Sequence, residues 1–271
     1  MPTYILRKDL NRTDKVLRPA RPNVGIEMAY RRKLYDLIEA MHKSCLYWIE
    51  AAYKAHLPVM AQDATPANEM ADAVRKLVRQ WMYNFDEASE SLADYFAKDV
   101  SERSDAALQA ILRKGGFTVK FQMSKGMKDI IDATVHQNVA LIKSIPTNYL
   151  TQVEGMVMRS VQTGRDLGQL AKDLQTQLGV TKRRAALISR DQNNKASAAM
   201  QRSRQLEMNL DRAIWMHSHG GKTQRPTHVA NNGKSYSIKD GWYDPAVGKH
   251  IWPGTEIGCR CVSRSIIPGF L

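Results

Sequence analysis

The sequence has little of what several protein classes require. Its 271 residues include three cysteines, Cys45, Cys259 and Cys261, which are too few for a disulfide framework, so an intracellular, reducing origin is expected. The apolar runs are a few residues long, far short of the ~20 that a membrane-spanning helix needs. The first residues, MPTYILRKDLNRTDK, have no apolar segment of the secretory type. We therefore expect neither a membrane span nor a signal peptide.

Motifs for the common catalytic chemistries are also missing. The segment G-G-K-T at 220–223 lacks the first glycine and the four-residue spacer of a phosphate-binding loop, and the G-x-S-x-G motif does not occur. A cysteine–histidine nucleophile pair can be drawn with any histidine, and nothing selects one. These observations favour a non-enzymatic protein. The alternative is a metal-dependent DNA-processing nuclease that uses His217, His219, His228 and Asp244.

Basic residues are abundant and unevenly placed. The formal net charge is +13, and the excess falls in residues 1–24, 182–212 and 217–271, while the rest of the chain is balanced. Such zones favour contact with a polyanion, most simply double-stranded DNA bound without sequence specificity, or with an acidic protein surface. A set of solvated charged faces is the alternative interpretation.

Hydrophobic periodicity predicts a mainly α fold, with a long-helix body and a small, loop-rich α+β C-terminal domain. Apolar residues recur at steps of three and four from Tyr30 through Cys45 and Trp48, and again from Met70 to Phe96. Cys45 lies on the first stripe and is expected to be a buried packing residue. We expect four regions: a basic arm (1–24), an N-terminal helical region (25–124), a second helical region with a basic helix (125–212), and a small C-terminal domain (213–271).

Prolines and glycines predict the helix boundaries within these regions. We expect the first helix to end at Pro58, a separate short helix at 104–114, and a strand or extended link at 117–123. Further stops are expected at Gly115-Gly116, before Pro146, at Gly164 and at Gly179. The basic helix, 181–208, carries a charged face that is expected to bind nucleic acid or a partner: Arg183, Arg184, Arg190, Lys195, Arg202 and Arg204.

The last ~57 residues contain four of the seven histidines and two cysteines that are one residue apart. Zinc takes four nitrogen or sulfur ligands, and such a centre stabilises a small loop-rich unit. His219, His228, Cys259 and Cys261 are the candidate ligands of a structural zinc ion. In a regular strand the two sulfurs would point to opposite faces, so a turn after Pro253-Gly254 is needed to bring them together. The alternative is that both cysteines are small buried residues and that the histidines bond the loop backbone.

Two arginines in this segment are expected to hold loops together. Arg225 and Arg260 each stand beside a turn-forming or rigid residue. A guanidinium has five donors, which can satisfy several loop carbonyls. We expect structural ties at both positions.

The ordered set of C-terminal motifs resembles the phage Mu F-like domain of minor head, or head morphogenesis, proteins. The motifs are Trp215, the R-P-x-H of 225–228, the turn Asn232-Gly233, the turn Pro253-Gly254 and the C-R-C of 259–261. The helical block at 138–196 is also similar, through Gly164, Leu170, Ala171, Gly179, Val180, Arg184, Ala185, Ile188, Arg190 and Asp191. The chain departs from the family where many members have an acidic residue before the histidine and this one has His217-Ser218-His219-Gly220-Gly221.

The resemblance covers roughly residues 125–265 and implies a structural role in a tailed bacteriophage. It implies a minor capsid protein that is associated with the portal vertex and contacts packaged DNA during head assembly or genome delivery. The implied partners are the phage portal protein, major capsid or scaffold proteins and double-stranded DNA, with no membrane. The implied location is the virion, at the capsid interior or portal vertex, after assembly in the host cytoplasm. A third interpretation is an interaction adaptor whose basic zones bind acidic portal surfaces.

Overall fold

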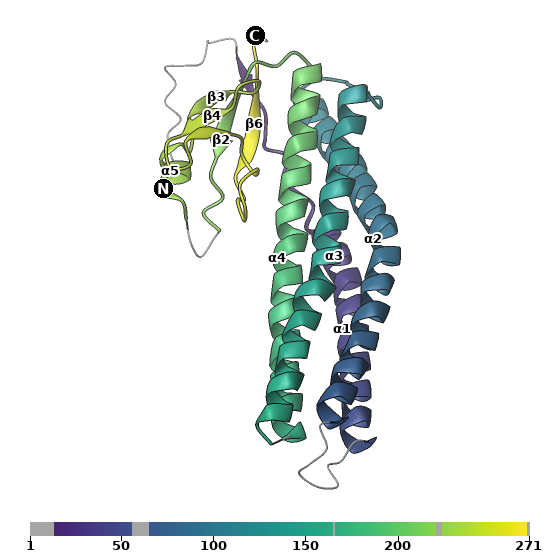
Figure 1. The fold of residues 1–271 in the computed structure, drawn as a ribbon. Coiled ribbons are helices and arrows are strands. Elements are labelled where there is room, and N and C mark those ends of the chain that lie inside the picture. The colour runs from purple at the N-terminus through teal and green to yellow at the C-terminus, as the bar shows by residue number, and fades with distance from the viewer. Residues whose placement is uncertain (1–13, 56–64, 165, 221–223, 270–271) are drawn as a thin grey trace. The chain divides into compact units, whose positions relative to one another are not determined.

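A computed structural model describes residues 14–55, 65–164, 166–220 and 224–269. Four long helices make up most of this chain (Figure 1): α1 (Val24–Ala55), α2 (Thr65–Lys114), α3 (Lys125–Gln162) and α4 (Leu167–Glu207). One short strand precedes these helices, and the remaining short strands and a one-turn helix follow them. The mainly α fold with a small C-terminal α+β region is therefore confirmed. No helix of the described residues combines the length and apolar character that crossing a membrane requires.

The chain divides into two compact units that do not follow the order of the sequence. Residues 28–95 and 135–189 form one, which we call the bundle unit. Residues 1–27, 96–134 and 190–271 form the other, which we call the sheet unit. The unit boundaries therefore fall within helices and not in loops.

The bundle unit is held by apolar stripes that face inward. In α1 the buried positions recur about every 3.6 residues, as expected of one helix face: Tyr30, Leu34, Ile38, Met41, Cys45, Ile49 and Tyr53. The buried packing role of Cys45 is confirmed. The prediction that Trp48 faces the core is wrong, because its side chain is 54% exposed while Ile49 is fully buried. Trp48 and Ile49, three and four residues after Cys45, both lie near the helix face of Cys45, and the aliphatic side chain of Ile49 occupies the core position.

Polar side chains also join the helices of the bundle unit. The Tyr30 hydroxyl donates to Asn138 Oδ1 at 3.0 Å, which connects α1 with α3. His42 Nδ1 lies 2.8 Å from the Tyr149 hydroxyl, about three turns further along the same two helices. Lys182 of α4 forms an ion pair with Glu39 of α1. These contacts fix the register of the helices, which apolar stripes alone leave loosely specified.

Some of the expected helix stops are correct and others are not. Helix α2 ends before Gly115 and α3 before Gly164, and Gly116 and Gly164 take positive φ angles of 94° and 99°. Helix α2 also runs unbroken through 104–114, and α3 and α4 continue through Pro146 and Gly179. Buried residues on both sides of these positions continue the stripe, and their packing outweighs a local cost of ~1–3 kcal/mol. The expected stop at Pro58 lies outside the described residues.

The sheet unit contains a four-stranded antiparallel sheet and a two-stranded ribbon. The sheet has the order β1-β6-β2-β3, and the ribbon pairs β4 with β5. The strand bounds are β1 (Lys15–Val16), β2 (Arg212–Met216), β3 (Ser235–Ser237), β4 (Trp242–Asp244), β5 (Lys249–Ile251) and β6 (Val262–Ile267). Trp215 of β2 is fully buried and meets the rings of Tyr236, Trp242 and His228 edge to face. Residues 117–123 form the extended link, because none of them is in a strand.

Candidate functional site

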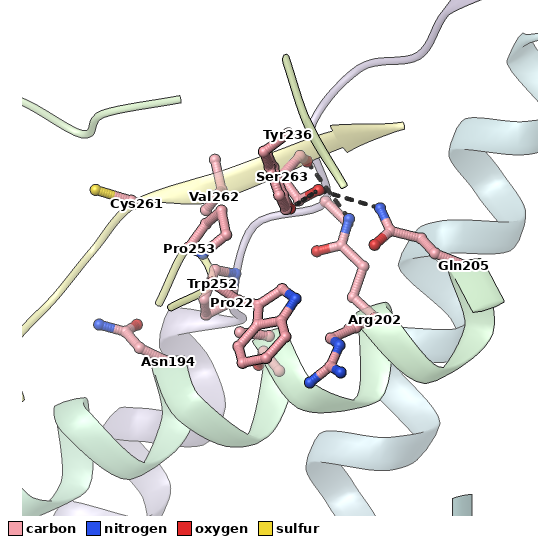
Figure 2. Close-up of a pocket in the computed structure, with 14 residues that line it drawn as sticks. Pro22, Asn194, Arg202, Gln205, Tyr236, Trp252, Pro253, Cys261, Val262 and Ser263 are labelled. Carbon is pink, nitrogen blue, oxygen red and sulfur yellow. Dashed lines mark hydrogen bonds between the residues drawn. The ribbon is translucent and has the colours of Figure 1, made fainter. Parts of the chain in front are cut away.

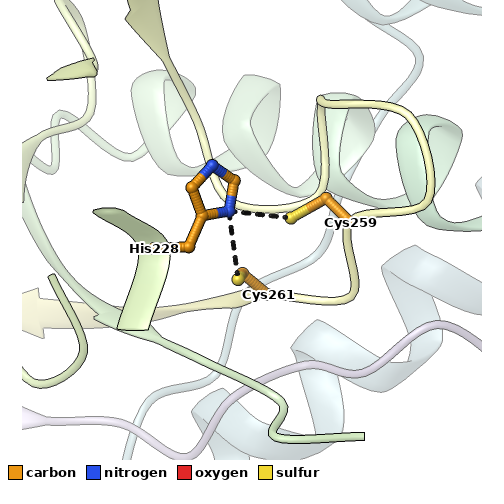
Figure 3. A group of neighbouring side chains, drawn as sticks. All are labelled: His228, Cys259 and Cys261. Atoms are coloured by element: carbon orange, nitrogen blue, oxygen red, sulfur yellow. Dashed lines mark hydrogen bonds between the residues drawn. The ribbon is translucent and has the colours of Figure 1, made fainter. Parts of the chain in front are cut away.

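Three residues from the last part of the chain meet in the interior of the sheet unit (Figure 3). His228 Nδ1 lies 3.6 Å from Cys259 Sγ and 3.7 Å from Cys261 Sγ. All three side chains are at least 96% buried, and their ligand atoms lie within 4.8 Å of one another. The structure thus brings together three of the four candidate zinc ligands. We call these three residues the His–Cys cluster.

The turn needed to converge the two sulfurs is present. Cys259 and Cys261 lie in the loop before β6, outside the regular strand, so the alternation of strand side chains does not apply to them. The Cys259 amide closes a turn on the Glu256 carbonyl at 2.9 Å, and Gly258 adopts a φ of +69°. His228 reaches the pair from α5 (Pro226–Ala230), a helix of one turn with proline at its start.

Contacts with helix α4 hold the C-R-C segment and the loop before it in position. Asp191 Oδ1 accepts a hydrogen bond from the Gly258 amide at 2.6 Å, and Asn194 Nδ2 donates to the Cys259 carbonyl at 3.0 Å. Gly254 approaches the helix so closely that an added Cβ would lie 2.9 Å from the Ala198 Cβ. The cysteine loop is therefore fixed by backbone contacts that are independent of its sulfur atoms.

A buried carboxylate stands on the other side of the imidazole. Asp244 is fully buried, and its Oδ2 lies 3.4 Å from His228 Nε2. Its Oδ1 accepts from the Ala246 amide at 3.0 Å, and the Thr227 hydroxyl donates to Oδ2 at 3.2 Å. Asp244 is thus anchored beside Nε2, which has no hydrogen-bond partner among the described residues, while Nδ1 faces the sulfurs.

The two thiols of the His–Cys cluster differ in acidity. The Cys261 thiol donates a hydrogen bond to the Cys259 sulfur, and this contact lowers the pKa of Cys259 against the opposing effect of burial, with His228 adding to the decrease. The same pairing and burial raise the pKa of the Cys261 thiol.

The fourth candidate ligand, His219, lies outside the cluster. It is exposed, has a φ of +52°, and its ring faces that of His217 at a centroid distance of 4.5 Å. His217 is half-buried and its Nδ1 accepts from the His219 amide at 3.2 Å. His217 borders a cavity of about 30 Å³ that also contacts all three members of the cluster. A cavity of this size holds one water-sized ligand.

The predicted basic face of α4 does not form one exposed surface. Arg183 is exposed, whereas Arg184 donates to the Ser144 hydroxyl at 2.9 Å and Lys195 pairs with Asp191 at 2.7 Å. Arg202 lies 3.7 Å from the centre of the Trp252 ring, and its guanidinium donates to the Ile238 carbonyl. Figure 2 shows this arginine beside the indole, in a pocket between α4 and β6.

Arg204 departs furthest from the expected surface role. It is 2% exposed and donates to both carboxylate oxygens of Asp105, at 2.8 and 2.6 Å. It also donates to the Gln122 carbonyl and to Glu207. Hydrophobic periodicity could not reveal this role, because the acidic partners lie about 100 residues away along the chain or on the next helical turn.

Arg225 and Arg260 each contact a loop carbonyl, as a loop tie would. Arg225 Nη2 donates to the Ile257 carbonyl at 2.9 Å, and Arg260 Nη1 donates to the Gly220 carbonyl at 2.7 Å. In the first bond a residue next to α5 donates to the cysteine loop. In the second bond a residue of the cysteine loop donates to the segment that follows β2. Both residues remain half-exposed.

A larger hollow of about 460 Å³ lies in the sheet unit and contains three guanidinium groups. Arg21, Arg190 and Arg260 line it together with His217 and one acidic residue, Glu27. The Nε atom of Arg190 is buried and has no hydrogen-bond partner among the described residues. We call this hollow the arginine groove. Its excess of cationic donors suits an anionic group.

Sequence reasoning did not identify Asn194 or the supporting role of Asp191, and it named Asp244 only as a nuclease candidate. Asp191 stood in the helical motif, but its contact with Gly258 spans 67 residues of sequence. A buried carboxylate beside histidine has no local sequence signature. The remaining signal was the position of Asp244 directly after an aromatic pair, Trp242-Tyr243.

Comparisons with known proteins bear on the same region. An uncharacterized protein of Haemophilus influenzae is 25% identical over 97% of this chain, and the chain spans 58% of the length of that relative. No solved structure matches. The family described as Phage Mu protein F like protein, a family of phage head morphogenesis proteins, matches residues 151–264. This match includes α4, the arginine groove residues Arg190 and Arg260, and the whole His–Cys cluster, so this part of the chain is similar to the Phage Mu F-like family.

Proposed function

We propose that the chain is a minor head protein of a tailed bacteriophage, located at the portal vertex and in contact with packaged DNA. The family match over residues 151–264 is the observation that carries this proposal. The region of the match supports a structural role, because its residues are used for packing and for loop ties. Head assembly in the host cytoplasm, followed by retention in the virion, is the corresponding life history.

The arginine groove is the surface that we assign to DNA. Arg21, Arg190 and Arg260 can reach phosphate oxygens from one hollow, and a single carboxylate, Glu27, opposes them. Binding of this kind is independent of sequence, and its affinity falls steeply with salt because counterions are released from the DNA. This assignment replaces the face of α4 that the sequence suggested.

DNA binding by the groove can be tested by measuring affinity against salt concentration. The double variant Arg21→Ala/Arg190→Ala is expected to weaken binding to duplexes of unrelated sequence alike. Its slope of log affinity against log salt is expected to fall by about two, or one for each lost phosphate contact. Arg183→Ala, which removes an exposed arginine of α4 outside the groove, is the matched control. Unchanged affinity in the double variant would reject the groove as the DNA surface.

Portal association needs a separate test. The chain is mixed with the portal protein of the same phage, digested with nuclease and analysed by sedimentation. A complex that survives digestion supports direct protein contact, whereas a complex that DNA alone maintains contradicts it. Mass spectrometry of purified heads then shows whether the chain stays in the particle with major capsid or scaffold proteins.

The alternative function, a metal-dependent nuclease, makes a different prediction. The His–Cys cluster is buried and its adjoining cavity is about 30 Å³, which is too small for a scissile phosphate with its flanking sugars. We expect no cleavage of DNA with Mg²⁺, Mn²⁺ or Zn²⁺. Cleavage that disappears in His228→Ala would establish the enzyme instead.

A further inference from the structure

We propose that the His–Cys cluster binds a zinc ion through His228 Nδ1, Cys259 Sγ and Cys261 Sγ, with Asp244 positioning the histidine. This assignment goes beyond the head-protein role and does not depend on it. It also changes the ligand set that the sequence suggested: His219 is no longer a ligand, and Asp244 is added as the residue that positions His228.

The distances within the cluster match those of a zinc coordination shell. Zinc lies about 2.0–2.1 Å from histidine nitrogen and about 2.3 Å from thiolate sulfur in tetrahedral sites, which places the nitrogen about 3.6 Å from each sulfur. The two nitrogen–sulfur distances are 3.6 and 3.7 Å. The spacing of the three atoms is therefore compatible with one zinc ion bound to all of them.

The surroundings of His228 have the second component of a histidine–metal site. Metal-bound histidines usually donate their other ring proton to a carboxylate or carbonyl, which fixes the tautomer and the ring orientation. Asp244 Oδ2 lies 3.4 Å from Nε2, and backbone and hydroxyl donors hold the carboxylate in place. The remaining nitrogen, Nδ1, faces the sulfurs (Figure 3).

Charge balance also favours a cation at this position. Two cysteine sulfurs and one carboxylate, all buried, share a single imidazole. Burying anionic groups without compensation is costly. A divalent cation would balance both thiolates and leave Asp244 to balance the histidine proton. Soft sulfur ligands with one imidazole select zinc over magnesium or calcium.

The fourth coordination position is assigned to the side of the cluster that faces the cavity of about 30 Å³. The cavity holds one water-sized ligand. The loop contacts from Asp191 and Asn194 hold the sulfurs near their positions before the ion arrives. The site is therefore preorganised, and zinc would fasten a loop that is already folded.

The experiment measures zinc in the full chain purified from zinc-supplemented cells and then replaces the ion with cobalt. We expect about one zinc per chain and a thiolate-to-cobalt charge-transfer band whose intensity indicates two sulfur ligands. Cys259→Ser, Cys261→Ser and His228→Asn are expected to lose at least tenfold in zinc affinity. Cys45→Ser, which alters a buried thiol of the bundle unit, is the matched control and keeps both zinc and the band.

Two further variants separate the roles of neighbouring residues. Asp244→Asn is expected to weaken zinc about 10–100-fold while the two-thiolate band remains, as a positioning residue would. His219→Ala is expected to leave zinc content unchanged. Circular dichroism verifies that each variant is folded. Removing the metal from the native chain and adding it back tests zinc binding without any mutation. A native chain that holds no zinc and gives no cobalt band would overturn the proposal, as would retention of zinc by both cysteine variants.

Discussion

The bundle unit and the sheet unit differ in what holds them together. In the bundle unit the backbone bonds are satisfied within long helices, so apolar side chains on one helix face carry most of the stability. In the sheet unit short strands leave many loop carbonyls, and side chains such as Asn194, Arg225 and Arg260 donate to them. This difference indicates that individual polar contacts determine the structure of the sheet unit, whereas packing spread over many side chains determines that of the bundle unit.

The largest expected effect tests packing in the bundle unit. Phe85 is fully buried and meets Trp81 edge to face. Phe85→Ala is expected to lower the free energy of unfolding of this unit by about 3–5 kcal/mol, because the change removes buried area and leaves a cavity. Urea denaturation followed by circular dichroism measures this. Tyr83→Ala, at an exposed position two residues away, is the control and should change stability by less than about 0.5 kcal/mol.

The second prediction tests a polar contact that is buried as deeply as the core. Arg204→Ala leaves Asp105 and Glu207 without their guanidinium and the Gln122 carbonyl without its donor. We expect a loss of about 3 kcal/mol, because removing one partner of a buried ion pair leaves the others uncompensated. Arg183→Ala on the same helix is the control. A loss no larger than that of the control would show that the sheet unit does not depend on this contact.

The same contrast explains what the sequence could predict. Stripes in α1 and α2 made the helices and most of the buried residues predictable, since period and burial are local properties. Helix stops were wrongly predicted at Pro146 and Gly179, because local propensity does not include the packing of buried residues on both sides of these positions. The contacts of Arg204 with Asp105 and of Asp191 with Gly258 join distant segments, so no local pattern contains them.

The convergence of His228 with Cys259 and Cys261 lies between these cases. Their residue types and crowding at the end of the chain indicated a cluster. The turn that aims both sulfurs at one nitrogen is a tertiary feature, since it depends on contacts with α4. His219 was an equally good candidate by residue type, and its exposed position after β2 excluded it from the cluster.

The third prediction concerns the close approach of a turn to α4 in the sheet unit. Gly254 has a φ of +87°, and a Cβ there would lie 2.9 Å from the Ala198 Cβ. Gly254→Ala is expected to cost about 2 kcal/mol, from backbone strain and overpacking together. Gly248 has a similar φ of +66°, but a Cβ added there would meet no atom within 4 Å. Gly248→Ala is therefore expected to cost about 1 kcal/mol, from backbone strain alone. Equal losses in thermal unfolding would contradict the close approach.

The smallest expected effect is a pH dependence of stability in the bundle unit, which arises from the buried His42. Burial lowers the pKa of His42, against the effect of its hydrogen bond with Gln175, and Lys182 adds to the decrease. Between that lowered value and the ordinary value near 6.5, the unfolded chain binds a proton that the folded chain does not. Stability is therefore complete above about pH 6.5 and declines as the pH falls below it. Urea midpoints measured between pH 7.5 and 5.5 should show this decline in the native chain and a smaller one in His42→Gln. His136→Gln, at an exposed position of α3, should retain the native slope, and an identical slope in all three proteins would mean that burial of His42 does not govern the acid response.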